Sequence, residues 1–181
     1  MIFTKHSKLE GLHAPFSASQ SSWLRYDDDK IIETYTNKKA TEMGTILHAW
    51  AKTTIELGIK QPRSKQTLYS YVNDAIGYQL SPEVVLFYSD RFFGTADAIG
   101  FRNNTLRIHD LKTGKTPAKM EQLFIYAALF CLEYKVKPGE IKIETRIYQN
   151  DEIVYANPTA EDILPIMDRI VYLDKLLREI E

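Results

Sequence analysis

The chain has 181 residues, 44% of them hydrophobic and 12% aromatic, which is enough to form the core of one compact domain. Its 23 lysine and arginine residues nearly balance its 24 aspartate and glutamate residues, so overall charge excludes a strongly basic nucleic-acid binder, and an anionic partner requires a local basic patch. A single cysteine, Cys131, excludes an intramolecular disulfide and any zinc site or iron–sulfur cluster held by four cysteines.

Hydrophobic spacing predicts two helices, three strands, a helix, a strand and a last helix. The predicted ranges are Ala40–Leu57, Thr67–Tyr78, Glu83–Ser89, Phe92–Phe101, Leu106–Lys112, Ala118–Tyr134, Ile141–Tyr148 and Thr159–Leu177. Thr159 and Asp162 have the spacing of a capping box at the start of the last helix. This order predicts one α/β domain over residues 1–181, with a central mixed β-sheet flanked by helices.

The sequence also contains no segment that predicts insertion into a membrane. The start of the chain, MIFTKHSKLEGLHAPF, lacks the apolar stretch of a signal peptide. The longest apolar run, LFIYAALFCL, is too short to span a bilayer. We therefore expect a soluble cytoplasmic protein.

Two aspartates, Asp97 and Asp110, lie in segments that otherwise resemble strands, although aspartate is depleted in strands and rarely buried without a partner. Asn103 and Asn104 tolerate positive φ and can form a two-residue hairpin turn between these segments. The expected cross-strand pairs are Phe101–Leu106, Ile99–Ile108 and Asp97–Asp110. An apolar face of the hairpin would then end in two carboxylates.

Directly opposed carboxylates repel, so this arrangement requires a positive charge between them. Lys112 follows Asp110 by two residues and is expected on the same face of its strand. A divalent cation is a compatible second source, since Mg²⁺ typically binds through one or two carboxylates. The alternative is a surface hairpin whose acids and lysine form an ordinary ion pair.

Four short motifs follow one another on the predicted elements. They are Gly44 and His48 in GTILH, Asp97 in GTADAI, Asp110 and Lys112 in DLKTGK, and Gln122 and Tyr126 in QLFIY. In this order, and over roughly Ser17 to Tyr148, the chain resembles the PD-(D/E)XK nuclease superfamily, most closely its RecB-type branch of phage and recombination exonucleases. The resemblance implies a restriction-endonuclease-like core.

The resemblance also implies which residues form the site. Asp97, Asp110, His48 and the backbone carbonyl of Leu111 would hold Mg²⁺ or Mn²⁺, with the imidazole favouring Mn²⁺. Asp97, Asp110 and Lys112 would be the catalytic residues, with Lys112 orienting or deprotonating the attacking water. Without the resemblance, His48 would be read as a partly buried packing histidine.

Further residues are expected to contact the substrate. Gln122 and Tyr126 lie four residues apart, on one helical face, and could hold a phosphate or the scissile strand. The alternative for this pair is a polar stripe at a helix edge. Lys115 adds to a local basic patch, and Glu83 matches an acid that relatives sometimes carry at the start of the preceding strand.

These implications lead to one functional expectation. We expect a metal-dependent DNA nuclease, an exonuclease of recombination or repair in a bacterial or phage-infected cell, with DNA and a recombination or replication protein as partners. Related proteins with an iron–sulfur cluster carry a cysteine soon after a Ser-x-Ser start; here Ser17 and Ser19 are present without it, so no cluster is expected. The alternatives are an endonuclease or junction resolvase of the same superfamily, and a nucleic-acid-binding module without turnover.

Overall fold

The computed structural model describes residues 7–9 and 14–180 of the chain. These residues fall into two compact units, one up to Met43 and one from Gly44 onward. The first unit contains the short 3₁₀ helices η1 (Ser7–Leu9) and η2 (Ser21–Arg25) and the beginning of helix α1 (Asp28–Glu56). Within it, the indole N–H of Trp23 donates a hydrogen bond to the Ser17 carbonyl at 2.9 Å.

The second unit contains the rest of α1 and a five-stranded sheet. Its further elements are α2 (Thr67–Gly77), β1 (Ser81–Ser89), β2 (Phe92–Arg102), β3 (Thr105–Leu111), α3 (Glu121–Tyr134), η3 (Pro138–Glu140), β4 (Lys142–Gln149), β5 (Glu152–Ala156) and α4 (Ala160–Arg178). The strand order is β1-β2-β3-β4-β5. Strands β3 and β4 are parallel and the other neighbours are antiparallel, so the predicted α/β class with a mixed sheet is confirmed.

The predicted hairpin between β2 and β3 is also present. Asn103 and Asn104 have φ values of 49° and 58°, which a two-residue turn with positive φ at both positions requires. The ladder pairs Ile99 with Ile108 and Phe101 with Leu106, as predicted. At the start of α4, the predicted capping box between Thr159 and Asp162 is confirmed as well.

The largest differences from the prediction are the start of α1 and an additional strand. Helix α1 begins at Asp28 rather than Ala40; Asp27 caps it, accepting a hydrogen bond from the Lys30 N–H at 2.8 Å. Ile32 and Tyr35 in the added turns are exposed, so no buried apolar stripe marks this part of the sequence as helix. Strand β5, which follows β4 after a tight turn, was not predicted.

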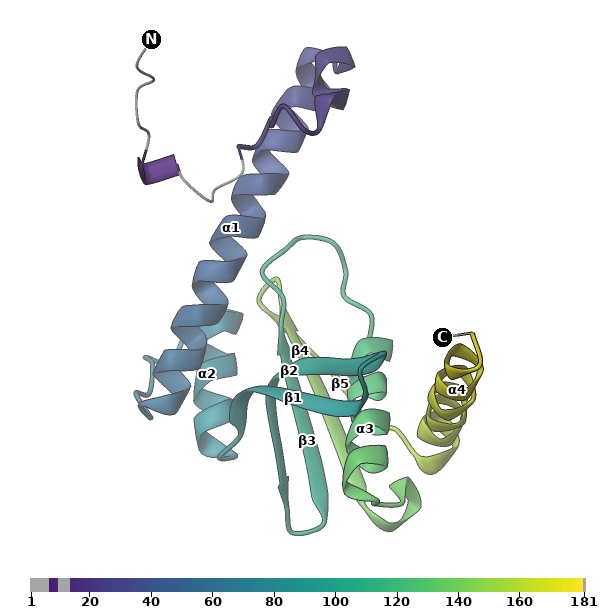
Figure 1. Cartoon of the computed structure of the whole chain (residues 1–181). Coiled ribbons are helices and arrows are strands. Elements are labelled where there is room, and N and C mark those ends of the chain that lie inside the picture. Colours follow the sequence, from purple (N-terminus) through teal and green to yellow (C-terminus); the bar gives the residue numbers. More distant parts are fainter. Residues whose placement is uncertain (1–6, 10–13, 181) are drawn as a thin grey trace. The chain divides into compact units, whose positions relative to one another are not determined.

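Helices cover both faces of the sheet, α2 on one side and α3, with α4 against it, on the other (Figure 1). The larger hydrophobic core lies between the sheet and α3, around residues such as Leu106, Ile108 and Leu123. A second core joins α1 and α2 to the opposite face through Ala51, Val72 and other residues. Both faces of β3 are therefore buried, and this strand carries Asp110.

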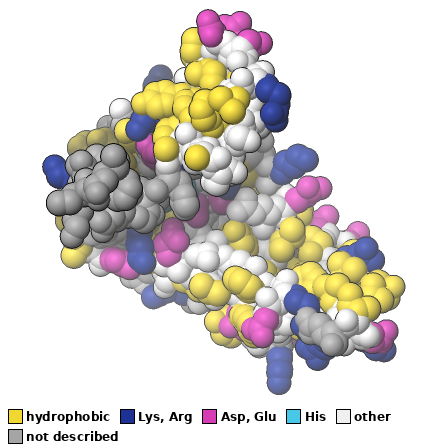
Figure 2. Space-filling model, turned by 45° about the horizontal axis from the view of Figure 1, so that its top comes forward, with side chains coloured by type: hydrophobic (Ala, Val, Ile, Leu, Met, Phe, Trp, Pro, Cys, Tyr) yellow, Lys and Arg dark blue, Asp and Glu magenta, His cyan; other side chains and the backbone are white. Residues whose placement is uncertain are grey.

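Helix α4 keeps several hydrophobic side chains exposed, including Leu164, Tyr172 and Leu176. Figure 2 shows hydrophobic side chains next to basic ones at the right-hand end of the view, where α4 lies. In the part of the chain that the structure describes, no helix has the length and apolarity needed to cross a bilayer.

A buried polar network fastens α2 to the sheet. The Tyr148 hydroxyl, which is fully buried, donates a hydrogen bond to Asp74 at 2.6 Å and lies 3.2 Å from His109 Nδ1. Arg146 donates to Asp74 at 3.1 Å and to the Tyr78 hydroxyl at 2.9 Å. Burial, together with the positive charge of nearby arginines, lowers the pKa of His109 to about 3, so its ring is neutral.

Removing the Tyr148 hydroxyl group tests how much this network contributes to stability. We expect Tyr148→Phe to lower the free energy of unfolding by about 2 kcal/mol, because the buried His109 ring and the half-buried Asp74 carboxylate lose a partner. The matched control is Tyr155→Phe, which removes an exposed hydroxyl from the neighbouring strand and should change stability by less than about 0.5 kcal/mol. Urea unfolding measures both, and equal effects would show that the buried hydroxyl contributes nothing special.

Candidate metal centre

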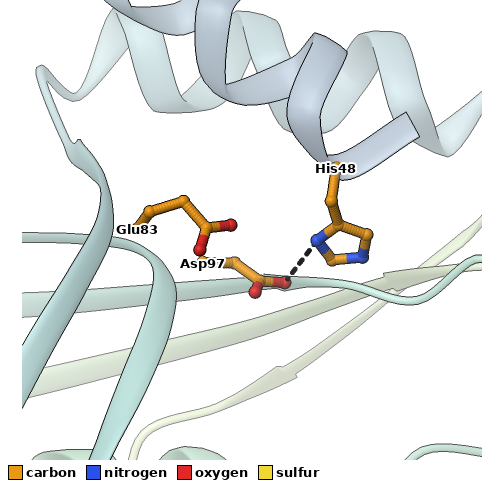
Figure 3. Close-up of side chains that lie close together, drawn as sticks. All are labelled: His48, Glu83 and Asp97. Atoms are coloured by element: carbon orange, nitrogen blue, oxygen red, sulfur yellow. Dashed lines mark ion pairs between the residues drawn. The ribbon is translucent and has the colours of Figure 1, made fainter. Parts of the chain in front are cut away.

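Three potential metal ligands gather from three elements of the second unit. His48 of α1, Glu83 of β1 and Asp97 of β2 each offer one ligand atom, and these atoms all lie within 4.8 Å of one another. Figure 3 shows the three side chains pointing toward a common space. His48 Nδ1 and Asp97 Oδ2 are 3.6 Å apart, close enough for attraction but too far for a hydrogen bond.

Gly44 explains how α1 comes close enough to contribute His48. It lies one helical turn before His48, on the same side of the helix, and it is buried. A Cβ atom at this position would lie 2.7 Å from the Thr113 hydroxyl oxygen, on the loop after β3. Gly44 therefore permits α1 to lie close to the loop after β3, and this position brings His48 to the metal centre.

Glu83 reaches the cluster through an unusual backbone conformation. Its φ of 53° is uncommon for a residue other than glycine. The β1–β2 ladder pairs Pro82 with Ala98 and Val84 with Ala96, which leaves Glu83 beside Asp97 at an unpaired step. The residue matched to the family pattern thus lies next to the two expected ligands.

Asp97 is held by a backbone group of the adjacent strand. Its Oδ2 atom accepts a hydrogen bond from the Leu111 N–H at 2.8 Å. The β2–β3 ladder ends at the pair Ala98–His109, so the expected Asp97–Asp110 pair is not part of it. The physical reason is that the Leu111 N–H donates its hydrogen bond to the side chain of Asp97 and not to the backbone of β2, so the ladder does not continue.

Asp110 belongs to a second chain of polar contacts. Its side chain is 1% exposed, and its Oδ1 accepts a hydrogen bond from Lys112 Nζ at 3.2 Å. Lys112 also donates to Gln122 Oε1 at 2.9 Å, and Gln122 Nε2 donates to the Tyr126 hydroxyl at 2.8 Å. Gln122 and Tyr126 do share one face of α3, as predicted, but Gln122 contacts the lysine.

Burial dominates the electrostatics of Asp110. Desolvation, and after it the negative charge of Asp97, raises the pKa of the Asp110 carboxyl to about 6, although Lys112 and His48 oppose this shift. Its Oδ2 atom lies 3.0 Å from Lys112 Nζ but has no hydrogen bond, although it is buried. Burying a carboxylate is costly; the ion pair with Lys112 offsets part of this cost, and an additional cation would stabilise the carboxylate further.

These observations fit a divalent cation. His48, Glu83 and Asp97 supply one imidazole and two carboxylates, a donor set that suits Mn²⁺ and also Mg²⁺. Asp110 adds a buried carboxylate oxygen without a hydrogen-bond partner. The contribution of the Leu111 carbonyl stays a prediction.

Lys115 lies apart from these contacts, exposed on the loop between β3 and α3. The side chain of Gln149 holds this loop, donating to the carbonyls of Gly114 at 2.6 Å and Thr116 at 2.8 Å, and accepting from the Ala118 N–H at 3.1 Å. Sequence reasoning missed Gln149, because a glutamine at the end of a strand carries no motif.

Comparison of the chain with protein-family models, with curated proteins and with solved structures finds no match. The site is therefore interpreted from its own residues, and the resemblance to the nuclease superfamily stays a prediction.

The buried charge of Asp110 predicts a pH-dependent stability. Because its pKa in the folded protein lies above that of a free aspartate, the native state is favoured by the neutral form; this contribution is complete below about pH 4 and is lost as the pH rises through about 6. Asp110→Asn removes the loss, so the free energy of unfolding of the variant relative to wild type should rise between pH 4.5 and 7.5, on the order of 2 kcal/mol.

The measurement is urea unfolding in EDTA at both pH values. Asp151→Asn, at an exposed position, reports the effect of removing a solvated carboxylate. A difference between Asp110→Asn and wild type that is the same at both pH values would contradict the buried charge.

Proposed function

We propose that this protein is a metal-dependent nuclease that hydrolyses phosphodiester bonds of DNA. The observation that carries the proposal is the meeting of two side-chain groups at the end of the β2–β3 hairpin. One is the cluster of His48, Glu83 and Asp97, and the other is the chain from Asp110 through Lys112 to Gln122 and beyond. Leu111, whose N–H binds Asp97, lies between Asp110 and Lys112 in the sequence, so the two groups adjoin at the end of β3.

The reaction adds water across a phosphorus–oxygen bond. The water oxygen bonds to phosphorus, the alcohol oxygen of the next nucleotide leaves, and the proton lost by water balances the proton that the alcohol gains. A divalent ion held by His48, Glu83, Asp97 and Asp110 would supply positive charge for the phosphate and for the incoming oxygen.

Lys112 is suited to act on the phosphate directly. An ammonium group has three N–H donors, and Asp110 and Gln122 accept two of them. The third can bind a phosphate oxygen and stabilise the negative charge that develops there. Asp110 and Gln122 thereby orient Lys112, and the Tyr126 hydroxyl, which accepts a hydrogen bond from Gln122, would contact the same strand of substrate.

Exonuclease action in recombination or repair is proposed from the resemblance of the motifs. A purely structural ion pair between Lys112 and Asp110 would give the same contact of 3.0 Å. The two explanations differ in what mutation does, because an ion pair supports stability whereas a catalytic lysine supports turnover.

The first functional test is cleavage of DNA. Purified protein should degrade end-labelled single- or double-stranded DNA with Mn²⁺ or Mg²⁺, and EDTA should stop the reaction. Lys112→Ala and Asp110→Asn should each lower the rate at least about 100-fold while circular dichroism shows an intact fold. The matched control is Lys142→Ala, which removes an exposed lysine at the start of β4 and should leave the rate unchanged. Cleavage that persists in excess EDTA would overturn the metal mechanism.

The second test concerns the metal ligands. Mn²⁺ should raise the melting temperature of wild type by mass action, and His48→Ala or Glu83→Gln should weaken Mn²⁺ binding at least about tenfold. At saturating Mn²⁺, a tenfold weaker affinity lowers the stabilisation by about 1.4 kcal/mol. Glu152→Gln, at an exposed position of β5, serves as the control.

The result for His48 separates a ligand from a packing residue. Unchanged Mn²⁺ affinity with a clearly lower melting temperature for His48→Ala would remove this histidine from the metal centre.

A further inference from the structure

One face of the β1–β2 ribbon exposes a strip of hydrophobic side chains. Val85 and Phe87 of β1 are 54% and 44% exposed, and Phe93 of β2 is 60% exposed. The ladder pairs Phe87 with Phe93 and Val85 with Thr95, so these four residues lie side by side. We call them the aromatic strip.

The strip lies on the face of the ribbon that is turned away from α3. Leu86 and Gly94 are paired, Leu86 is buried in the core beneath α3, and a Cβ at Gly94 would lie 2.9 Å from the ring of Tyr126 of α3. Because side chains alternate along a strand, Phe87 and Phe93, next to this pair, point the other way.

The strip also lies close to the candidate metal centre. The pair Val85–Thr95 is followed by the pair Val84–Ala96, and Glu83 and Asp97 come directly after it. His48 comes from α1, which packs with α2 on the face of the sheet opposite α3, the face that carries the strip. At about 3.3 Å per residue, Phe93 lies about 13 Å along the strand from Asp97.

We propose that the aromatic strip stacks unpaired bases of the DNA strand whose phosphodiester lies at the metal centre. This inference rests on the proposed nuclease function and names its substrate class, a strand that is single-stranded next to the cleaved bond. Bases in a stacked strand are spaced by about 3.4 Å, so about 13 Å accommodates about four of them.

The chemistry of the strip favours bases over phosphates. Its four residues carry no charge and only Thr95 has a polar side chain, so it offers little to the sugar-phosphate backbone, while the rings of Phe87 and Phe93 can stack with bases of any sequence. Backbone pairing fixes the two phenylalanines on adjacent strands, which provides a preformed platform. Paired bases are stacked inside a duplex and cannot use it, so the strip selects single-stranded or frayed ends.

Binding can be measured without cleavage. The experiment uses the full chain, Ca²⁺ in place of Mg²⁺, and fluorescence anisotropy of a labelled single-stranded oligonucleotide. A second oligonucleotide of the same length has abasic sugars in place of four consecutive nucleotides. The variants are Phe93→Ala, Phe87→Ala and Phe93→Leu, the last of which keeps apolar area but loses the ring.

Phe101→Ala is the matched control. Phe101 lies on the same strand as Phe93 and is similarly exposed, at 42%, but its ring packs against Phe130 of α3. It is therefore an exposed phenylalanine outside the strip. Thermal melts of all variants show whether each remains folded.

The expected results distinguish stacking from other contacts. Wild type should bind the ordinary oligonucleotide about tenfold more tightly than the abasic one. Phe93→Ala should lose this preference and bind both equally weakly, Phe93→Leu should lose most of it, and Phe101→Ala should keep it. A blunt duplex should bind more weakly than the single strand.

Three outcomes would overturn the inference: no measurable binding of the single strand, equal binding of ordinary and abasic strands by wild type, or an unchanged preference in Phe93→Ala. A change of oligomeric state in Phe93→Ala, seen by light scattering with base preference intact, would instead assign the strip to a second copy of this chain. Failure of the nuclease proposal is a separate result, because it requires absence of cleavage with Mn²⁺ and Mg²⁺, whatever the binding data show.

Discussion

A single hydrogen bond, from the Leu111 N–H to Asp97 Oδ2 at 2.8 Å, joins the parts of the candidate site. It fixes the Asp97 carboxylate at the place where the β2–β3 ladder ends, beside Glu83 and within reach of His48. Because Leu111 directly follows Asp110, the same contact sets the distance between the metal cluster and the lysine chain. Together with the β2–β3 ladder, it therefore holds the two side-chain groups in a fixed relation.

The least favourable feature of this arrangement is the burial of the Asp110 carboxyl group. This group is 1% exposed and its pKa is raised to about 6, chiefly by burial, so the folded protein holds a charge at neutral pH that burial disfavours. A residue kept only for stability would not be placed in this way, since an apolar side chain of similar size is often at least as favourable. Lys112 offsets part of the cost, and a bound cation would offset more.

Several local features of the fold could be predicted from the sequence, because single residue types favour specific backbone conformations. The turn at Asn103 and Asn104 and the capping box of α4 both follow from residue types with a specific backbone role. Strand β5 was missed although Asn150 and Asp151, with φ of 52° and 60°, form a similar turn. Motif spacing singled out His48 and Asp97, which the structure brings close together, and Lys112, which contacts Asp110. The place of Glu83 depends on the β1–β2 register, which no short motif encodes. The contact between Gln122 and Lys112 likewise depends on how α3 packs, which spacing along one helix cannot show.

The central claim is that His48, Glu83 and Asp97 bind one divalent cation. The most direct measurement is a crystal structure of the protein with Mn²⁺, using the anomalous signal to locate the ion. The claim predicts a peak among these three side chains, with ligand atoms at about 2.1 Å. A crystal in which Mn²⁺ is bound elsewhere, or in which the three side chains are ordered around no peak at saturating Mn²⁺, would contradict it.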